Sequence, residues 1–505
     1  MLSKVYSATT VGLDGVLIDV EVDVAGRGFP TFTIVGLPNK SIDEAKERVR
    51  TAITNAGYEM PDSRITVNLA PADIPKTGSS FDLPIALGIL ASANIIQKDQ
   101  LAESIFLGEL SLEGKLRQVP GVISVAILAK EKIFQRLFIP TDNVSEASLI
   151  TSVTLYPVES LTQLIFHLNK QKEITPYIKS LNQDEEEELY EYDFADIKGQ
   201  EQAKRALEIA ASGFHNVHLK GVPGAGKTML SRAFPSILSP LSEEEILEVS
   251  RIYSISGLLN GKARMASRPF RAPHHTTSRI GLIGGGTNPS PGEISLAHRG
   301  VLFLDEFPEF PRSVLESLRQ PLEDGQVTVS RAAGSLTFPS RFLLLAASNP
   351  CPCGYLGHPV KRCKCFPGAI ASYNKRISGP LLDRIDIHID VPPVDEVKLT
   401  SEHTAEASAK IRSRVQAAIK RQKQRYTKSD IKSNNELTPL EIKKYCRFSD
   451  DATALLKQAV SRLSLSARSY FKIVKISQTI ADLAGEELIA RDFVAEALQY
   501  RMKED

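Results

Sequence analysis

The segment 221–228 constrains the fold of this chain more than any other feature. It has the sequence G-V-P-G-A-G-K-T, which matches the pattern G-x-x-x-x-G-K-[ST]. An apolar stretch, 217–219, precedes it, and a helical pattern follows from Met229. In this setting the glycines let backbone N–H groups surround phosphates, Lys227 neutralises the terminal phosphates, and Thr228 ligates Mg²⁺. The sequence therefore predicts a parallel-sheet domain that binds ATP and Mg²⁺. The predicted cofactor-binding residues of this loop are Gly221, Val222, Pro223, Gly224, Ala225, Gly226, Lys227 and Thr228.

Two further apolar stretches end in polar residues that suit the same kind of site. Residues 301–304 are Val, Leu, Phe and Leu, and Asp305 and Glu306 follow them directly. The stretch 342–347 is also apolar, and Asn349 lies two residues beyond it. Open parallel sheets bind their ligands at the carboxyl ends of the strands. We therefore expect Asp305 to hold Mg²⁺ through water, Glu306 to act as general base, and Asn349 to orient the attacking water.

The length of 505 residues predicts about three folding units. The first contains clean two-residue alternation over 16–24, which is typical of a half-buried strand, and then further strands and helices. Seven acids between 183 and 193 indicate a solvated linker. The end of the chain carries helical periodicity, for example over 451–463 and 469–484. The predicted fold class is α/β, with an N-terminal domain at 1–180, an acidic linker at 181–193, a P-loop domain at 194–393 and a helical lid at 394–505.

Composition places the chain among ordinary globular proteins. With 42% hydrophobic and 24% charged residues, it has neither the profile of a disordered chain nor that of a membrane protein. The most apolar run, 83–96, is shorter than a bilayer span and contains Pro84 and Gly88. The first fifteen residues lack the apolar block of a secretory signal. We therefore expect a cytoplasmic protein without a membrane partner.

Four of the five cysteines lie within fifteen residues of one another. Such clustering in a cytosolic chain favours a metal site over disulfides or unliganded thiols. Four thiolates complete a tetrahedral zinc site and leave no open position, so the predicted Zn²⁺ is structural. The gaps of one residue are tighter than usual, and His358, inside the loop, could replace one ligand. The predicted zinc ligands are Cys351, Cys353, Cys363 and Cys365.

Three longer motifs carry a resemblance to a known family. They are R-P-F-R-A-P-H-H-T at 268–276, P-G-E-I-S-L-A-H at 291–298 and L-L-D-R-I-D at 381–386. These motifs resemble the magnesium-chelatase-like branch of the AAA+ ATPases, and the whole chain resembles the ComM/YifB family of competence proteins. The resemblance implies a ring, expected to be a hexamer of identical chains. It further implies an ATP-driven DNA motor that promotes branch migration when incoming DNA is integrated in natural transformation.

The resemblance also assigns roles to three residues. It makes Asn349 the sensor 1 residue, Arg384 the arginine finger that reaches into a neighbouring subunit, and Arg468 the sensor 2 residue of the helical lid. An arginine supplied in trans makes hydrolysis depend on assembly, because such fingers contribute roughly 10³ to 10⁵ in rate. Sequence alone would instead favour surface salt bridges for both arginines.

Basic residues between the two ATP motifs predict a DNA-binding surface. The stretch 249–292 contains neither Asp nor Glu. An insertion there could line the pore of a ring and follow a phosphate backbone. The region 325–338 reads as a hairpin with Arg331 near its tip, and the basic run 410–432 favours a solvated helix face. The predicted DNA contacts are Lys262, Arg264, Arg268, Arg271, Arg279 and Arg331.

Residues 76–82, K-T-G-S-S-F-D, resemble the nucleophile region of Lon-type Ser-Lys proteases, with Ser80 at the serine position. That resemblance places Ile123 where the lysine base would be, and isoleucine cannot deprotonate a hydroxyl. We expect a Lon-like fold without hydrolytic activity, unless Lys115 or Lys130 serves from another register.

Two other classes of function stay open at this point. One is a chelatase-like subunit that uses ATP to remodel a protein partner. The Lon-like segment and the cysteine cluster argue against it. The other is an ATP-dependent protease, which Ile123 disfavours.

Overall fold

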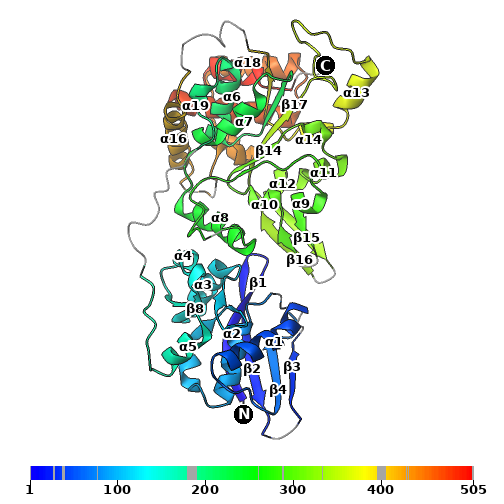
Figure 1. The fold of residues 1–505 in the computed structure, drawn as a ribbon. Coiled ribbons are helices and arrows are strands. Elements are labelled where there is room, and N and C mark those ends of the chain that lie inside the picture. Colours follow the sequence, from blue (N-terminus) through cyan, green and yellow to red (C-terminus); the bar gives the residue numbers. More distant parts are fainter. Residues whose placement is uncertain are drawn as a thin grey trace.

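The computed structural model describes residues 2–26, 29–36, 40–74, 76, 78–178, 190–259, 261–286, 289–331, 334–394, 405–427, 429 and 431–502. An N-terminal α/β body occupies one end of the molecule, and a second sheet covered by helices occupies the other, with helix α8 (Glu243–Ile255) between them (Figure 1). Most of the predicted acidic linker lies outside the described residues. None of the described helices combines the length and the apolar character that crossing a bilayer requires.

The N-terminal body is built on a seven-stranded mixed sheet with the order β3-β4-β2-β1-β5-β8-β9. The alternation predicted over 16–24 is confirmed, because Ile18, Val20 and Val22 are fully buried. Helix α2, buried along its whole length, packs against β1 and β2. The elements are β1 (Leu2–Val11), β2 (Asp14–Val24), β3 (Thr31–Val35), α1 (Lys40–Asn55), β4 (Arg64–Ala70), α2 (Asp82–Ser92), β5 (Ser104–Phe106), β6 (Glu109–Leu110), β7 (Leu116–Arg117), α3 (Val122–Glu131), β8 (Arg136–Pro140), α4 (Val144–Ala147), β9 (Thr154–Val158) and α5 (Leu161–Leu168).

The second body contains a five-stranded sheet whose described pairings are all parallel, in the order β11-β14-β17-β10-β18. The predicted strands at 217–219 and 301–304 are confirmed, and the third begins at Leu343, one residue later than expected. Its strands are β10 (Val217–Gly221), β11 (Phe270–Arg271), β14 (Val301–Leu304), β17 (Leu343–Ser348) and β18 (Ile387–Val391). Its helices are α6 (Glu201–Gly213), α7 (Lys227–Ala233), α9 (Arg279–Ile283), α10 (Glu293–Leu296), α11 (Arg312–Glu316), α12 (Arg319–Asp324), α13 (Pro367–Asn374) and α14 (Gly379–Leu382).

Two short ribbons accompany this sheet. The hairpin expected at 325–338 is present as β15 (Gln326–Arg331) paired with β16 (Gly334–Pro339). The other ribbon pairs β12 (Gly284–Gly285) with β13 (Ser290–Pro291). On β16, Leu336 packs close to Gly12, at the turn between β1 and β2, so the hairpin lies against the N-terminal body (Figure 1).

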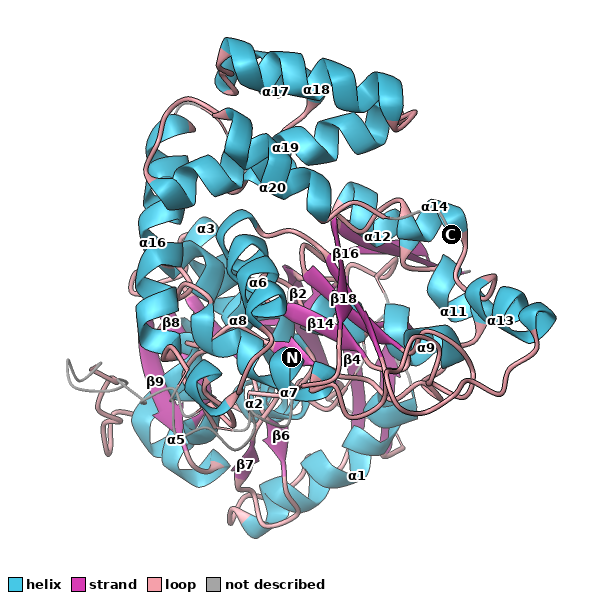
Figure 2. Ribbon diagram, turned by 90° about the horizontal axis from the view of Figure 1, so that it is seen from above, coloured by secondary structure: helices cyan, strands magenta, loops and turns pink. Residues whose placement is uncertain are grey.

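The C-terminal residues form helices, as predicted, and these stack above the parallel sheet (Figure 2). Helices α16 and α19 pack on α6, so the helical segment shares one hydrophobic core with the sheet. The elements are α16 (Ser408–Arg425), α17 (Pro439–Tyr445), α18 (Asp450–Arg462), α19 (Ala467–Ala484) and α20 (Arg491–Gln499).

Helix α8 joins the two bodies. Ile123 of α3 is fully buried in a hydrophobic cluster with Val249 and Ile252 of α8. Polar contacts reinforce this interface, because the Ser254 hydroxyl donates to the Glu146 carboxylate at 2.7 Å. The position that a Lon-type protease would give to its base is therefore part of a packing interface.

Candidate active site

The loop 221–228 lies at the carboxyl edge of the parallel sheet, between β10 and α7. Gly221 must be a glycine, because a Cβ there would approach the Val391 carbonyl oxygen to 2.4 Å. Gly224 and Gly226 have φ angles of +79° and +87°, and a Cβ on either would meet no atom within 4 Å. The backbone is thus exposed on the side where phosphates approach a loop of this type.

Lys227 is buried at the start of α7 and gathers three acceptors. Its Nζ donates to the carbonyls of Gly221 at 2.6 Å and Val222 at 3.0 Å, and to Asn349 Oδ1 at 3.1 Å. Burial lowers the pKa of this amine, and the nearby Asp305 carboxylate opposes that shift. The contact brings Asn349, which follows β17, to the phosphate-binding loop.

The two acids after β14 meet the same loop. The Thr228 hydroxyl donates to Asp305 Oδ2 at 2.9 Å, the arrangement expected of two groups that share one Mg²⁺. Glu306 has a left-handed backbone, φ +51°, and its N–H donates to Asp305 Oδ1 at 2.9 Å. This conformation directs the chain so that both carboxylates stay at the edge of the sheet. The residues therefore fit ATP and Mg²⁺, with Thr228 and Asp305 as the metal-side pair.

His275 is a member of this site that sequence reasoning missed. Its Nδ1 lies 3.4 Å from Glu306 Oε2, and its ring lies 4.1 Å from that of His274, centroid to centroid. The contact follows from strand register, because β11 pairs with β14 at Phe270 and Val301. His275 and Glu306 each come five residues after their paired residue. The histidine pair in the motif at 268–276 was the available signal.

The predicted arginine finger, Arg384, and the predicted sensor 2 residue, Arg468, lie at the opposite, amino edge of the sheet. Arg384 precedes β18, whose residue Ile387 pairs with Val217 at the start of β10. The phosphate loop begins at the other end of β10, roughly 13 Å away for the four residue steps from Val217 to Gly221. Arg468, at the start of α19, contacts the same acid as Arg384, namely Glu323. Both arginines are therefore remote from the phosphate loop of their own chain.

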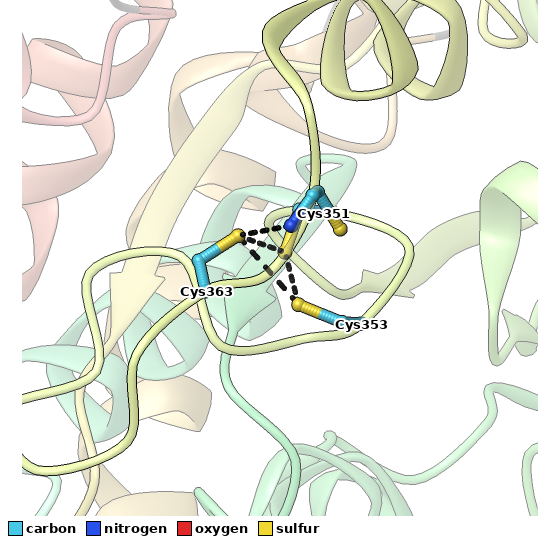
Figure 3. A group of neighbouring side chains, drawn as sticks. Cys351, Cys353 and Cys363 are labelled. Atoms are coloured by element: carbon cyan, nitrogen blue, oxygen red, sulfur yellow. Dashed lines mark hydrogen bonds between the residues drawn. The ribbon is translucent and has the colours of Figure 1, made fainter.

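The four clustered thiols converge on one point, as Figure 3 shows for three of them. All four sulfur atoms lie within 4.8 Å of one another. The Sγ of Cys351 is 3.4 Å from that of Cys353 and 3.7 Å from that of Cys363. A tetrahedral Zn²⁺ with bonds of about 2.3 Å needs sulfur atoms about 3.8 Å apart, so the cluster fits a four-coordinate zinc ion.

The thiol cluster packs against the phosphate loop. A Cβ on Gly354, between the second and third thiols, would lie 2.5 Å from Cγ of Pro223. Gly354 also has a φ of +82°, which glycine adopts without strain. The cluster thus supports the loop directly, a relation that the sequence did not reveal.

Most of the predicted DNA-contacting arginines have acidic or carbonyl partners within the chain. Arg268 is largely buried and contacts the Ser239 and Arg299 carbonyls and the Glu245 carboxylate. Arg271 forms a bidentate ion pair with Glu293, at 2.7 and 2.8 Å. Arg264 lies 3.6 Å from Glu243. The stretch 249–292 has no acid of its own, but Glu243, Glu245 and Glu293 on either side of it offset part of its positive charge.

The remaining predicted DNA contacts are Lys262, Arg279 and Arg331. Lys262 and Arg279 are exposed, and Arg279 is the first residue of α9. Arg331 ends β15, and its side chain lies outside the described residues. In the basic run, α16 has a buried apolar face, and Arg414 pairs with Glu406 and Glu208. The solvated-face interpretation of that run agrees with these contacts.

The Lon-like segment does not assemble a Ser-Lys pair with the residues weighed from sequence. Ser80 is half-buried, and Lys115 instead pairs with Glu113 at 3.2 Å. Lys130 is exposed on α3. Lys76 is buried and donates to the Pro71 carbonyl, and Ser79 donates to the Glu109 carboxylate.

Family models match three parts of the chain. Residues 193–399 match the magnesium chelatase subunit ChlI model, 20–143 match a second model described as subunit ChlI of Mg-chelatase, and 405–501 match the ChlI C-terminal model. With the parallel sheet and its phosphate loop, these matches define a magnesium-chelatase-like AAA+ protein, a class that suggests ATPase activity.

Full-length relatives narrow the class further. The chain is 43% identical to the competence protein ComM of Haemophilus influenzae, over 99% of this chain and 97% of the relative. It is 40% identical to the uncharacterized protein YifB of Salmonella typhimurium, over 99% and 97%. The magnesium-chelatase 67 kDa subunit of Heliobacterium mobile is 28% identical over 33% of this chain and 29% of that subunit. The chain belongs to the ComM/YifB family.

Proposed function

We propose that this protein is a cytoplasmic, ring-forming AAA+ ATPase that moves along DNA as a branch-migration helicase and promotes integration of incoming DNA. The observation that carries the ATPase is the meeting of Lys227, Thr228, Asp305 and Asn349 at one edge of the sheet. ATP would lie along the loop 221–228, and Mg²⁺ would be held by Thr228 and Asp305. Glu306 would be the carboxylate that takes a proton from the attacking water.

The position of the arginines supports the proposal that the chain assembles into a ring. Arg384 cannot cross the sheet to its own phosphate loop, whereas the arginine of a neighbouring copy can approach that loop in a head-to-tail ring. A ring of six copies is the closed assembly we propose. Hydrolysis would then require contact between copies, because the arginine stabilises charge that develops on the transferred phosphoryl group.

Family membership, the exposed residue Arg279 and the β15–β16 hairpin support the proposal that the protein moves along DNA. The Haemophilus influenzae relative is named for competence, and we extend that role to this chain. Arg279 is exposed, and the β15–β16 hairpin carries Arg331 at its end. Arg279, Lys262 and Arg331 are the residues we propose to contact a phosphate backbone; Arg268 and Arg271 would maintain the fold of the segment.

The test is ATP hydrolysis by the full chain with no DNA, single strands, duplex and a branched junction, together with strand displacement from the junction. DNA should raise the rate, and displacement should require ATP. The matched inactive control is Lys227→Ala. ATPase activity that ignores all three DNAs, without displacement, would contradict the DNA motor.

A second candidate function is chelatase-like remodelling of a protein partner. The family models and the Heliobacterium mobile subunit favour it, because their names refer to magnesium chelatase. The same assay separates the two functions: hydrolysis indifferent to DNA supports remodelling. An ATP-dependent protease is disfavoured by the burial of Ile123, and Ser80→Ala should leave every activity unchanged.

We also propose that the thiol cluster holds a structural Zn²⁺ through Cys351, Cys353, Cys363 and Cys365. Metal analysis of the purified chain should find one zinc per chain. Cys353→Ser should lose it, and Cys446→Ser, which changes a buried thiol outside the cluster, should keep it. Zinc content unaffected by Cys353→Ser would contradict the assignment.

A further inference from the structure

Glu323 joins the two arginines at the amino edge of the sheet. Its Oε1 lies 2.5 Å from Nη2 of Arg384, and Nη2 of Arg468 donates to the same oxygen. The three residues come from different parts of the chain: α12, the turn after α14, and the start of α19. One carboxylate therefore contacts two guanidinium groups, and that of Arg384 also donates to the Pro380 carbonyl.

The charges explain why such an acid is needed. Two guanidinium groups this close together repel each other. The negative charge of the carboxylate between them offsets that repulsion. The ion pair with Arg384 lowers the pKa of Glu323, with a further contribution from Arg468, so the carboxylate is ionised at neutral pH. The Arg384 side chain is 9% exposed, whereas those of Glu323 and Arg468 are 45% and 41% exposed. The open side of the cluster is thus accessible to another molecule.

Further cationic groups surround this cluster. Arg384 and Arg468 line a cavity of about 940 Å³ together with Lys472 and Lys475. The two lysines are half-buried, and their amines donate to backbone carbonyls, Lys472 to that of Ile385 at 2.8 Å and Lys475 to that of Asn435 at 2.7 Å. The Arg384 Nε is buried and has no hydrogen-bond partner among the described residues. Acids, among them Asp383, Asp386 and Glu436, also line this cavity, so its charge is mixed. The part of its wall that suits the oxygen atoms of an anion is the pair of guanidinium groups of Arg384 and Arg468.

The cluster is also linked to the β15–β16 hairpin. Helix α12 ends at Asp324, and Gly325, with φ +64°, turns the chain into β15. The Ser340 N–H, at the end of β16, donates to the Gly325 carbonyl at 2.8 Å. Glu323 therefore lies two residues from the base of the hairpin that we propose as a DNA contact.

We propose that Glu323 is a positioning residue, which holds Arg384 and Arg468 together as one receptor for the nucleotide phosphates bound to a neighbouring copy. The inference rests on the proposed function, since it assumes that neighbouring copies share the ATP site. It adds that the two arginines act as a unit and that an acid of their own chain sets their spacing. The acid touches neither the nucleotide nor the reacting atoms.

The test is steady-state ATP hydrolysis by the full chain carrying Glu323→Gln, which keeps the size of the side chain and removes its charge. Loss of an ion pair of this kind should lower kcat about tenfold. KM for ATP should stay within about twofold, because the phosphate loop lies at the other edge. The matched control is Glu316→Gln, which removes an acid that pairs with Arg319 at 3.1 Å on the neighbouring helix.

A double-mutant cycle separates positioning from a general effect on folding. Glu323→Gln should have no further effect on the residual rate of a chain that already carries Arg384→Ala and Arg468→Ala. An unchanged kcat for Glu323→Gln, or an equal loss in the arginine-free background, would overturn the inference. A wild-type chain without ATPase activity would instead refute the proposed function, so the two failures can be told apart.

Discussion

The two edges of the five-stranded sheet carry the two groups of residues that our proposal combines in one shared site. At the carboxyl edge, the phosphate loop, Asp305 and Asn349 contact one another within the chain. At the amino edge, Arg384 and Arg468 both contact Glu323. In our proposal, one chain therefore binds the nucleotide at its carboxyl edge, and the arginines that complete hydrolysis come from a neighbouring copy.

The largest expected effects come from substitutions at the two edges. We expect the carboxyl edge to be essential for nucleotide binding and the amino edge for hydrolysis. Lys227→Ala should abolish nucleotide binding, because it removes the cation of the loop. Arg384→Ala should lower hydrolysis at least 10³-fold and leave binding intact. A fluorescent ATP analogue measures binding, and phosphate release measures hydrolysis. Loss of nucleotide binding in the unassembled Arg384→Ala chain would contradict the separation of the two edges, since it would place this arginine at the phosphate loop of its own chain.

A second prediction concerns the support of the carboxyl edge. Gly354→Ala should lower nucleotide affinity about tenfold, because its Cβ would push Pro223 and the loop. Gly357→Ala is the matched control: Gly357 has a similar φ, +78°, but a Cβ there meets no atom within 4 Å. Titration with the same analogue measures both. Equal losses for the two variants would show that backbone strain, and not the contact with Pro223, is responsible.

The strands that connect the two edges contain two histidines, of which His218 is buried and His388 is half-buried. Burial lowers the pKa of His218 on β10 to about 3 and that of His388 on β18 to about 4. An unfolded histidine takes up its proton near pH 6.5, so the unfolded state binds more protons between about pH 4 and 6.5. Stability should therefore fall as the pH drops through this window, by up to about 1.4 kcal/mol per unit for each histidine.

Thermal melting at pH 7.0, 6.0 and 5.0 checks this prediction. His218→Asn should flatten the dependence, and the Ser348 hydroxyl, 2.8 Å from the His218 ring, remains available to the new side chain. A variant with the same slope as the wild type would show that other groups control the acid response.

The sequence predicted the carboxyl edge well because each of its parts is local. A phosphate loop between a strand and a helix, and acids directly after an apolar strand, are read from neighbouring residues. The contacts of Arg268 and Arg271 with Glu245 and Glu293 were not predicted, since they depend on how distant elements pack. The strand order β11-β14-β17-β10-β18 is equally hidden in the sequence. Without that order, the separation of the two edges could not be derived.

The most direct test of the shared site mixes two inactive chains. Lys227→Ala keeps its arginines, and Arg384→Ala keeps its phosphate loop. In rings of randomly mixed copies, about one quarter of the interfaces would combine an intact loop with an intact arginine. Our account predicts that the equimolar mixture recovers ATPase activity that neither variant shows alone. A mixture that forms mixed rings and stays as inactive as its components would contradict the shared site.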